Sequence, residues 1–477
     1  MKRADAIVVG SGPNGLAAAL TLARAGVTVE VYEASSSPGG GCRTEELTLP
    51  GFLHDVCSAV HPLLAASPFF RRTDLSEAGV KLLTPTVAFA HPLDGGRAAS
   101  VGGTVQETAS RLGVDETAYR RLMGPIVEHA DRLIATVLSP MRSVPAAPIA
   151  AASFALKGLL PAERLAARFR TEEAQALVAG VAAHAVRPLR APLTGGFGLV
   201  MLMLAHSVGW PVVEGGSARV VDALVAELES LGGRVLLDRR VRDLAELPAA
   251  KAVLLDVDTN QLLDLAGEQL PEIRRRMLRR FRYGPGVCKV DWALSAAVPW
   301  EAEPCRQTAT LHLGGTMAEI ALSESEVAAG RHPDRPYCIV VQPSVLDPSR
   351  APTGSQTLWA YCHVPPGSTV DMADRITAQI ERFAPGFAEL VLARKVETAA
   401  VVAERNPNYV GGDITGGAGT LRQTLFRPAL QWNPYRTDVE GVYLCSASTP
   451  PGGGVHGMCG AGAAAVALSD LGVRRGS

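Results

Sequence analysis

The chain has 477 residues, of which 47% are hydrophobic, 19% are charged and 5% are aromatic, and its formal net charge is −1. This composition is typical of a packed globular protein rather than a disordered one, and the length favours two domains. The near-neutral charge, without a basic stripe interleaved with aromatics, argues against a nucleic-acid-binding protein.

The first 33 residues predict a strand, a glycine turn, a helix and a second strand, in that order. An apolar run over 6–9 suits a buried parallel strand and leads directly into G-x-G-x-x-G. The first glycine permits the bend, the second lets the backbone approach a pyrophosphate, and the third lets the helix pack on the strand. The second strand, 27–32, is followed by a glutamate that can accept hydrogen bonds from ribose hydroxyls. We therefore predict a bound adenine dinucleotide, held by Gly10, Gly12, Pro13, Asn14, Gly15 and Glu33.

The next segment, 34–44, is rich in glycine and ends in Arg43 and Thr44. Here the chain resembles the flavin-dependent amine oxidase and phytoene desaturase superfamily, whose members carry a glycine pair followed by Arg-Ser/Thr after the ribose acid. The resemblance implies that the segment lies against the FAD pyrophosphate, and it leaves the role of one additional glycine undefined. NAD-only dehydrogenases need no such loop, so FAD is the expected cofactor. Its contacts from this segment are expected at Gly40, Gly41 and Arg43.

The C-terminal segment 441–465 predicts a buried strand, a Pro-Gly turn and a helix of small residues. It resembles the flavin motif of the branch that contains carotenoid desaturases and isomerases, retinol saturase and pyridine nucleotide-disulfide oxidoreductase domain-containing protein 2. In that branch the strand meets the ribityl chain and the turn lies beside the isoalloxazine. Ala447 departs from the pattern, because many flavoproteins have an aspartate there. The resemblance implies cofactor contacts from Ser446, Gly454, Val455 and His456.

Interior segments extend the resemblance over nearly the whole chain. Residues 51–58 match the family's P-G-F-x-x-D-x-x-S, and 283–294 and 406–413 also resemble this branch. A strand expected at 235–241 contacts adenine through its backbone in relatives, which implies a contact from Val241. No second G-x-G-x-x-G precedes a helix between 210 and 285, so we expect no dedicated NAD(P)H domain.

We expect an α/β fold in which a Rossmann-like FAD-binding domain, as in a GR2-type flavoprotein, is interleaved with a mixed α+β substrate domain. The FAD-binding domain is expected to be discontinuous, and the substrate domain to close a cavity over the flavin. The expected boundaries are 1–80, 210–285 and 421–477 for the FAD-binding domain, and 81–209 and 286–420 for the substrate domain.

Within the substrate domain, segment 141–165 is rich in alanine and leucine. In membrane-associated relatives such a region dips into lipid, although a core helix of the substrate domain is the favoured interpretation here.

Cysteine spacing and the ends of the chain bound its environment. The eight cysteines show no C-x-x-C and no metal-ligand spacing, so we expect reduced thiols, no metal and a non-covalent FAD. A covalent link through Cys445 or Cys459 is disfavoured because no known covalent motif matches. The start has no signal-peptide core, and no apolar run is long enough to span a bilayer. We expect a cytoplasmic protein, and peripheral membrane contact or a homo-oligomer stays open.

Three residues are candidates for catalysis. His456 opens the terminal helix, where the helix dipole would keep it neutral and able to relay a proton, or where it simply caps the helix. Lys289 lies on a predicted strand where amine oxidases often hold a lysine-bound water near flavin N5, and an exposed strand lysine is the alternative. Tyr409 belongs to a glycine-rich loop near the cavity roof, where it meets substrate or only forms a turn.

The expected function is that of an FAD-dependent oxidoreductase. It would dehydrogenate a C–C or C–N bond of a largely apolar small molecule, with hydride going to flavin N5 and electrons to oxygen or a quinone. The alternatives are an amine or amino-acid oxidase, which the low aromatic content disfavours, and a redox-neutral flavin-dependent isomerase. A flavin-bearing binding or regulatory protein without turnover is a third possibility.

Overall fold

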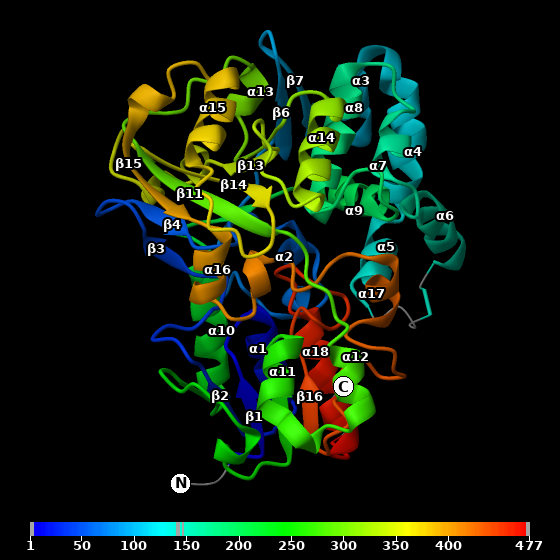
Figure 1. Ribbon diagram of the computed structural model, residues 1–477, viewed down its shortest axis with the longest axis vertical. Helices are drawn as coiled ribbons and strands as arrows, with labels where there is room; N and C mark the ends of the chain where they lie inside the picture. Colours follow the sequence, from blue (N-terminus) through cyan, green and yellow to red (C-terminus); the bar gives the residue numbers. More distant parts are fainter. Residues whose placement is uncertain (1–3, 140–143, 146, 474–477) are drawn as a thin grey trace.

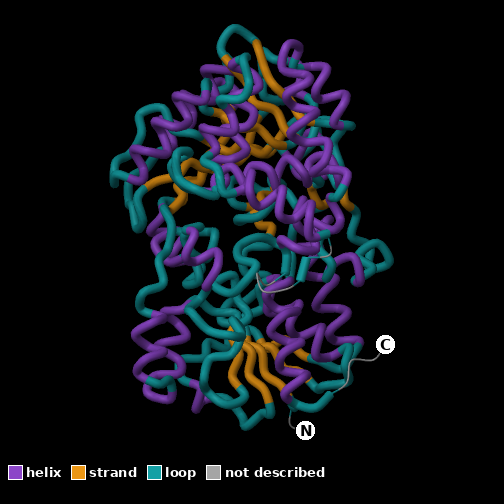
Figure 2. Tube along the Cα trace, turned by 90° about the vertical axis from the view of Figure 1, so that its right-hand side faces the viewer, coloured by secondary structure: helices purple, strands orange, loops and turns teal. Residues whose placement is uncertain are grey.

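The computed structural model describes residues 4–139, 144–145 and 147–473. A five-stranded sheet and a seven-stranded sheet organise these residues, together with two short two-stranded ribbons. Figure 1 shows the five-stranded sheet in the lower part of the molecule and the seven-stranded sheet in the upper part. After a quarter turn the two sets of strands are again separate, with helices beside each (Figure 2).

The five-stranded sheet draws its strands from three separate parts of the chain. Its order is β16-β10-β1-β2-β9, and every neighbouring pair is parallel. The carboxyl ends of the strands therefore meet at one edge, where doubly wound folds bind their ligands. The strands are β1 (Ala6–Val9), β2 (Val29–Tyr32), β9 (Arg234–Leu236), β10 (Ala252–Leu255) and β16 (Val442–Leu444).

Helices cover both faces of this sheet, which explains its continuous apolar strands. Along β1, Ala6 and Val8 belong to one hydrophobic cluster, whereas Ile7 and Val9 belong to another on the opposite face. The first cluster includes residues of α1 (Pro13–Ala23), α10 (Ala218–Ser230) and α18 (Met458–Asp470). The second includes residues of α11 (Thr259–Ala266) and α12 (Glu272–Leu278).

The seven-stranded sheet has the order β15-β11-β14-β13-β12-β6-β7. Its neighbouring strands are antiparallel, except that β12 and β6 are parallel. One face packs against α13 (Glu303–Arg306) and α15 (Ala373–Phe383). The strands are β6 (Phe89–Leu93), β7 (Arg97–Val101), β11 (Gly286–Leu294), β12 (Thr310–Leu313), β13 (Cys338–Val341), β14 (Gln356–Val364) and β15 (Val391–Glu397).

A group of helices lies beside this sheet (Figure 1). Among them α9, whose sequence is apolar on nearly every side, is largely buried. The group comprises α3 (Val105–Arg111), α4 (Glu116–Glu128), α5 (Ala130–Val137), α6 (Pro148–Gly158), α7 (Ala162–Ala166), α8 (Glu172–Ala182) and α9 (Thr194–Ser207).

Helix α6 corrects the expectation of a core helix within 141–165. Its Ile149 and Leu156 side chains are 88% and 71% exposed, and only Gly158 is fully buried. Ala150, Ala151 and Phe154 pack against the neighbouring hydrophobic cluster. Helix α6 is therefore a surface helix, because its alanines offer too little apolar area to be enclosed on all sides. Residues 140–143 and 146 of that segment lie outside the described residues.

Short elements connect the two main sheets. The ribbons pair β3 (Thr44–Glu46) with β4 (Leu53–Asp55) and β5 (Leu82–Leu83) with β8 (Val212–Val213). The remaining α-helices are α2 (Pro62–Ala66), α14 (Met317–Ala328), α16 (Ala399–Arg405) and α17 (Leu421–Phe426). Among the residues that the structure describes, no helix has both the length and the hydrophobicity needed to cross a bilayer.

Candidate active site

A cavity of about 400 Å³ extends from the carboxyl edge of the five-stranded sheet to one face of the seven-stranded sheet. Most of the predicted site residues line it, whereas Gly15, Lys289 and His456 do not. The predicted residues in its wall are Gly10, Gly12, Pro13, Asn14, Glu33, Gly40, Gly41, Arg43, Val241, Tyr409, Ser446, Gly454 and Val455.

The glycine turn after β1 is closed from below by Asp256, which directly follows β10. A Cβ atom on Gly12 would lie 2.8 Å from Oδ2 of Asp256, and one on Gly15 would lie 2.1 Å from the carbonyl oxygen of Gly10. Gly15 therefore permits close packing, and its amide donates to Asp256 Oδ2 at 2.9 Å. Burial raises the pKa of Asp256 to about 7, although the Gly15 hydrogen bond opposes the shift.

Sequence reasoning missed Asp256, although a signal was present. An acid that directly follows an apolar parallel strand has the same placement as Glu33 after β2.

The carboxylate of Glu33 is held in a defined orientation at the cavity wall. Oε2 accepts hydrogen bonds from the amide and hydroxyl of Ser11 at 2.9 and 2.6 Å, and Oε1 accepts from the amide of Ser35 at 2.8 Å. The chain of β9 continues alongside it, since the amide of Arg239 donates to the Glu33 carbonyl at 2.7 Å. Arg239 and Val241 also line the cavity. The strand predicted at 235–241 is shorter in the structure and ends at Leu236.

The segment after Glu33 explains the additional glycine. A Cβ atom on Gly41 would lie 2.2 Å from the hydroxyl oxygen of Tyr409, so this position has room only for hydrogen. Gly40 has a positive φ of 56° and packs over Gly12, where a Cβ would be 3.2 Å from the Gly12 Cα. The two glycine segments thus lie against each other at the cavity wall.

The donors at this end of the cavity fit a dinucleotide. Nε of Arg43 and Oδ1 of Asn14 are buried and have no hydrogen-bond partner within the described residues, although both residues line the cavity. A guanidinium suits a phosphate, and the Glu33 carboxylate suits ribose hydroxyls. The helix α1 directs its N-terminal end, with its positive dipole, at the same place.

The C-terminal turn reaches the cavity through Ser446, Gly454 and Val455, but His456 lies behind it. His456 is 1% exposed; its Nε2 donates to the Gly452 carbonyl at 3.1 Å, and its Nδ1 accepts from the Met458 amide at 3.0 Å. Burial lowers the pKa of His456 to about 4, so the ring is neutral. This geometry favours the interpretation of His456 as a helix cap that fixes the glycine turn.

Lys289 is buried rather than exposed on its strand. Its Nζ contacts both carboxylate oxygens of Asp291 at 2.5 Å and lies 5.4 Å from the ring centre of Trp359. Burial raises the pKa of Asp291 to about 6 against the opposing effect of Lys289. Nδ1 of His54 lies 3.5 Å from the same carboxylate. Lys289 therefore belongs to a buried charge cluster beside the cavity, behind Trp359.

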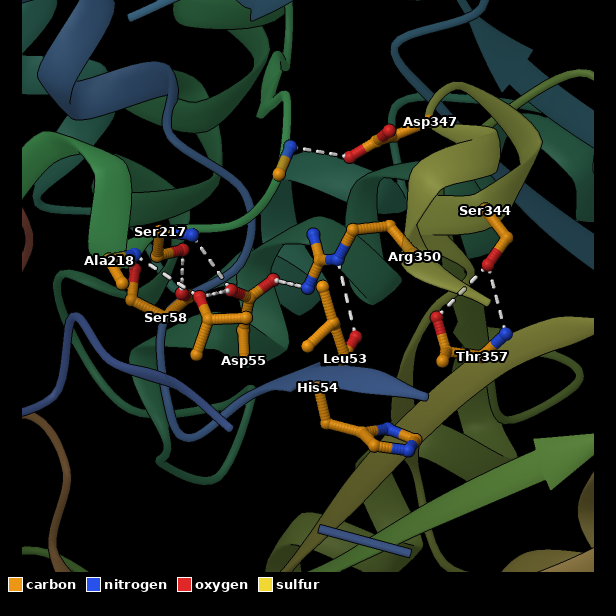
Figure 3. A network of polar contacts seen from close by, with 12 residues as sticks. Leu53, His54, Asp55, Ser58, Ser217, Ala218, Ser344, Asp347, Arg350 and Thr357 are labelled. Carbon is orange, nitrogen blue, oxygen red and sulfur yellow. Dashed lines mark hydrogen bonds and ion pairs between the residues drawn. The ribbon is translucent and has the colours of Figure 1, made fainter. Parts of the chain in front are cut away.

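A second buried ion pair joins the lower and upper parts of the molecule (Figure 3). Asp55, from the 51–58 segment, accepts from Arg350 at 2.8 Å, and both side chains are almost fully enclosed. Its other oxygen accepts from the Ser217 amide and the Thr44 hydroxyl, each at 2.8 Å. Burial alone would raise the pKa of Asp55, but the charge of Arg350 and these hydrogen bonds hold it below its ordinary value. The Asp in P-G-F-x-x-D-x-x-S thus anchors the ribbon β3–β4 to the start of α10.

The far end of the cavity is mostly apolar and aromatic. The side chains of its wall come from η3 (Ala183–Ala185), α9, β12, β13 and β14. They are His184, Met201, Trp210, Thr310, Ile339, Val341, Trp359 and Tyr361. Sequence reasoning named none of them, although the alternation of polar and apolar residues in T-L-H-L and of aromatic and small residues in W-A-Y is a signal for a sheet face.

Comparison with known proteins agrees with this geometry. Residues 8–72 match the model of the NAD(P)-binding Rossmann-like domain. The chain is 28% identical to pyridine nucleotide-disulfide oxidoreductase domain-containing protein 2 of Rattus norvegicus, over 98% of this chain and 94% of that protein. It is 24% identical to a limonene dehydrogenase polypeptide of Castellaniella defragrans, over 99% and 96%. A shorter match, 31% over 26% of this chain and 25% of the relative, links it to a phytoene desaturase (neurosporene-forming) of Rhodobacter capsulatus.

Solved structures share the fold over nearly the whole chain. An oxidoreductase from Methanosarcina mazei superposes with a TM-score of 0.65 at 16% identity, covering 97% of this chain and 99% of that one. A putrescine oxidase variant gives a TM-score of 0.62 at 18% identity, covering 98% and 99%. The chain belongs to the superfamily of flavin-dependent oxidoreductases that includes the phytoene desaturases and pyridine nucleotide-disulfide oxidoreductase domain-containing protein 2.

Proposed function

We propose that this enzyme binds FAD non-covalently and removes two hydrogens from a C–C or C–N bond of a largely apolar small molecule. One observation carries the proposal: a single cavity connects the dinucleotide-binding turn with the aromatic face of the seven-stranded sheet. A cofactor at the first end and a substrate at the second would therefore meet inside the protein, away from bulk water.

The residues at the cofactor end bind and orient rather than react. Bound FAD supplies a hydride acceptor, which no side chain provides. Glu33 is pre-oriented by Ser11 for a ribose, and Arg43 offers an unpaired guanidinium nitrogen to a phosphate. Gly454, with a positive φ of 126°, lets backbone approach a planar ring.

Buried thiols support non-covalent binding. Burial raises the pKa of Cys459 to about 11 and also raises the pKa of Cys445, so both are neutral thiols. Neither cysteine is among the residues that line the cavity.

The substrate end favours an apolar molecule. Met201, Ile339 and Val341 line it, and the acidic residues of the cavity wall, Glu33, Asp256 and Asp258, all belong to the cofactor end. A substrate ammonium would find no carboxylate partner among the described lining residues there. The names of two relatives, which refer to limonene and phytoene, are consistent with this chemistry.

Of the three predicted catalytic residues, Tyr409 is the one whose side chain lines the cavity, and we assign it to orienting the bound molecules. Lys289 and His456 act, in this proposal, as positioning residues behind the wall. Oxygen or a quinone would remove the electrons, as expected from the sequence.

An amine oxidase is the second candidate, because one feature favours it. Trp359 and Tyr361 stack in the cavity wall with ring centres 5.7 Å apart and an interplanar angle of 14°, a surface suited to a cation or an amine. The fold is also shared with a putrescine oxidase.

Anaerobic flavin reduction separates these candidates. The purified yellow protein is mixed with a terpene and lipid panel, and separately with an amine panel, while the flavin absorbance is followed. The proposal predicts bleaching by a member of the first panel, with a product lighter by two hydrogens. Bleaching by amines alone would establish the amine oxidase, and an isomerised product without net reduction would contradict both.

A further inference from the structure

The face of the seven-stranded sheet that meets the cavity carries a polar pair at its β12 end. Strand alternation places Thr310 and His312 on this face, while Leu311 and Leu313 pack in the hydrophobic cluster on the other side. Thr310 lines the cavity, and His312 lies one step further along the strand and is fully buried.

His184 connects His312 to the cavity. It lies in η3, directly after α8, and its side chain forms part of the cavity wall. Its Nε2 lies 2.7 Å from Nε2 of His312, and the two rings are perpendicular with centres 4.8 Å apart. Trp210 packs edge-on against both rings. The imidazole of His184 is thus fixed between the sheet and the cavity.

The surroundings of His312 select the tautomers of the pair. An Nε2–Nε2 hydrogen bond requires one ring to donate and the other to accept. Nδ1 of His312 is buried without a partner in the described residues, so a proton on it would be an orphaned donor. An orphaned buried N–H is rarer and costlier than an unused lone pair. His312 therefore donates through Nε2, and neutral His184 carries its proton on Nδ1.

Two further observations agree with this assignment. His91, in the same region, donates from Nε2 to the Gly315 carbonyl at 2.7 Å and leaves its own Nδ1 as a buried lone pair. Burial lowers the pKa of His184 to about 3 and that of His312 well below its ordinary value, so each ring is neutral near pH 7.

Nδ1 of His184 is not paired within the described chain. It makes no hydrogen bond to a described residue, and unlike Nδ1 of His312 and of His91 it is not shielded from the cavity. Its neighbours in the wall, such as Met201 and Ile339, are apolar and accept no hydrogen bond.

We propose that the Nδ1–H group of His184, oriented by His312, donates a hydrogen bond to an oxygen atom of the substrate. The substrate class is thereby narrowed to an apolar skeleton that carries a carbonyl, hydroxyl or ether oxygen. This inference rests on the proposed function only in taking the cavity as the substrate site. His184 is a specificity-determining residue, and His312 is its positioning residue.

The first test reads the tautomers directly. Holoprotein with ¹⁵N-labelled histidine gives nitrogen–proton correlations that distinguish protonated from unprotonated ring nitrogens, and the spectrum of His184→Gln assigns His184. The proton is expected on Nδ1 of His184 and on Nε2 of His312. A proton on Nε2 of His184 overturns the proposal.

The second test compares two ligands with one skeleton, menthone and p-menthane, by tryptophan fluorescence. In His184→Phe the preference for menthone over p-menthane is expected to fall about tenfold relative to wild type, as one hydrogen bond is worth. His91→Gln, a buried histidine outside the cavity wall, is the matched control and is expected to keep the wild-type ratio. An unchanged ratio in His184→Phe, or no binding of either molecule, overturns the inference. Because neither readout requires turnover, failure of the proposed oxidoreductase activity would be seen separately.

Discussion

At the scale of single residues, the contact between Gly41 and Tyr409 makes a sharp prediction. Gly41→Ala would place a Cβ 2.2 Å from the Tyr409 hydroxyl oxygen, and overpacking of this kind costs about 1–3 kcal/mol. We expect the free energy of unfolding, measured in urea, to fall by that amount. Adding Tyr409→Phe removes the oxygen, and the double variant should regain most of the loss. Additive effects of the two substitutions would contradict this packing.

The pair Asp55–Arg350 makes a second prediction at this scale. Arg350→Met leaves the Asp55 carboxylate buried without its cation, which costs about 3–5 kcal/mol. The loss should be visible as a lower urea midpoint. The exposed pair Arg71–Asp131 supplies the matched control, because Arg71→Met should cost less than about 1 kcal/mol. Equal losses in the two variants would show that burial of the first pair is not what matters.

At the scale of elements, the crossing of α1 and α18 depends on one glycine. A Cβ on Gly460 would lie 1.8 Å from the Asn14 carbonyl oxygen, so Gly460→Ala must push the two helices apart. We expect a loss of at least about 1–3 kcal/mol in unfolding free energy and weaker retention of FAD on desalting, because Asn14 opens the helix at the cofactor end. Gly419→Ala, where the nearest atoms to a new Cβ are 3.9 Å away, should change stability by less than about 1 kcal/mol.

The elements around the dinucleotide site could be predicted because their signals are local. Spacing alone places Gly10, Gly12 and Glu33, since a strand, a turn and a helix fix their relative positions. Residues such as Asp256 and Arg350 approach the site only through tertiary contacts hundreds of residues apart in the chain. The position of His456 behind its turn was equally out of reach, because a backbone hydrogen bond at each ring nitrogen turns the ring away from the cavity.

The substrate end was the least predictable part. Its wall combines η3, α9 and three strands, and the pairing of β12, β13 and β14 decides which side chains share a face. Sequence alternation indicates that two faces exist but not which one meets a cavity. The surface position of α6 was mispredicted for a related reason: an Ala-rich apolar segment suits both a buried and an exposed helix.

At the scale of the whole molecule, buried histidines predict loss of stability in weak acid. Burial lowers the pKa of His61, His91 and His456 to about 4, and that of His54 to about 3. Between about pH 6.5 and about pH 4 the unfolded chain therefore binds more protons than the folded one, so stability falls as the pH falls. Asp256 and Asp291, whose pKa values are raised, oppose this trend with fewer groups.

Urea unfolding at several pH values checks this balance. The midpoint should drop steadily on acidification through that window, and His91→Gln should flatten the slope by removing one contributing group. A midpoint that rises on acidification would mean that the carboxyl groups dominate.

The most direct test of the central claim is the identity of the chromophore released when the purified protein is denatured. The cofactor end of the cavity, with Glu33, Arg43 and the glycine turns in its wall, predicts FAD in the supernatant by mass, equimolar with the chain. A colourless protein, a released NAD(P), or a flavin that stays attached to the polypeptide would contradict it.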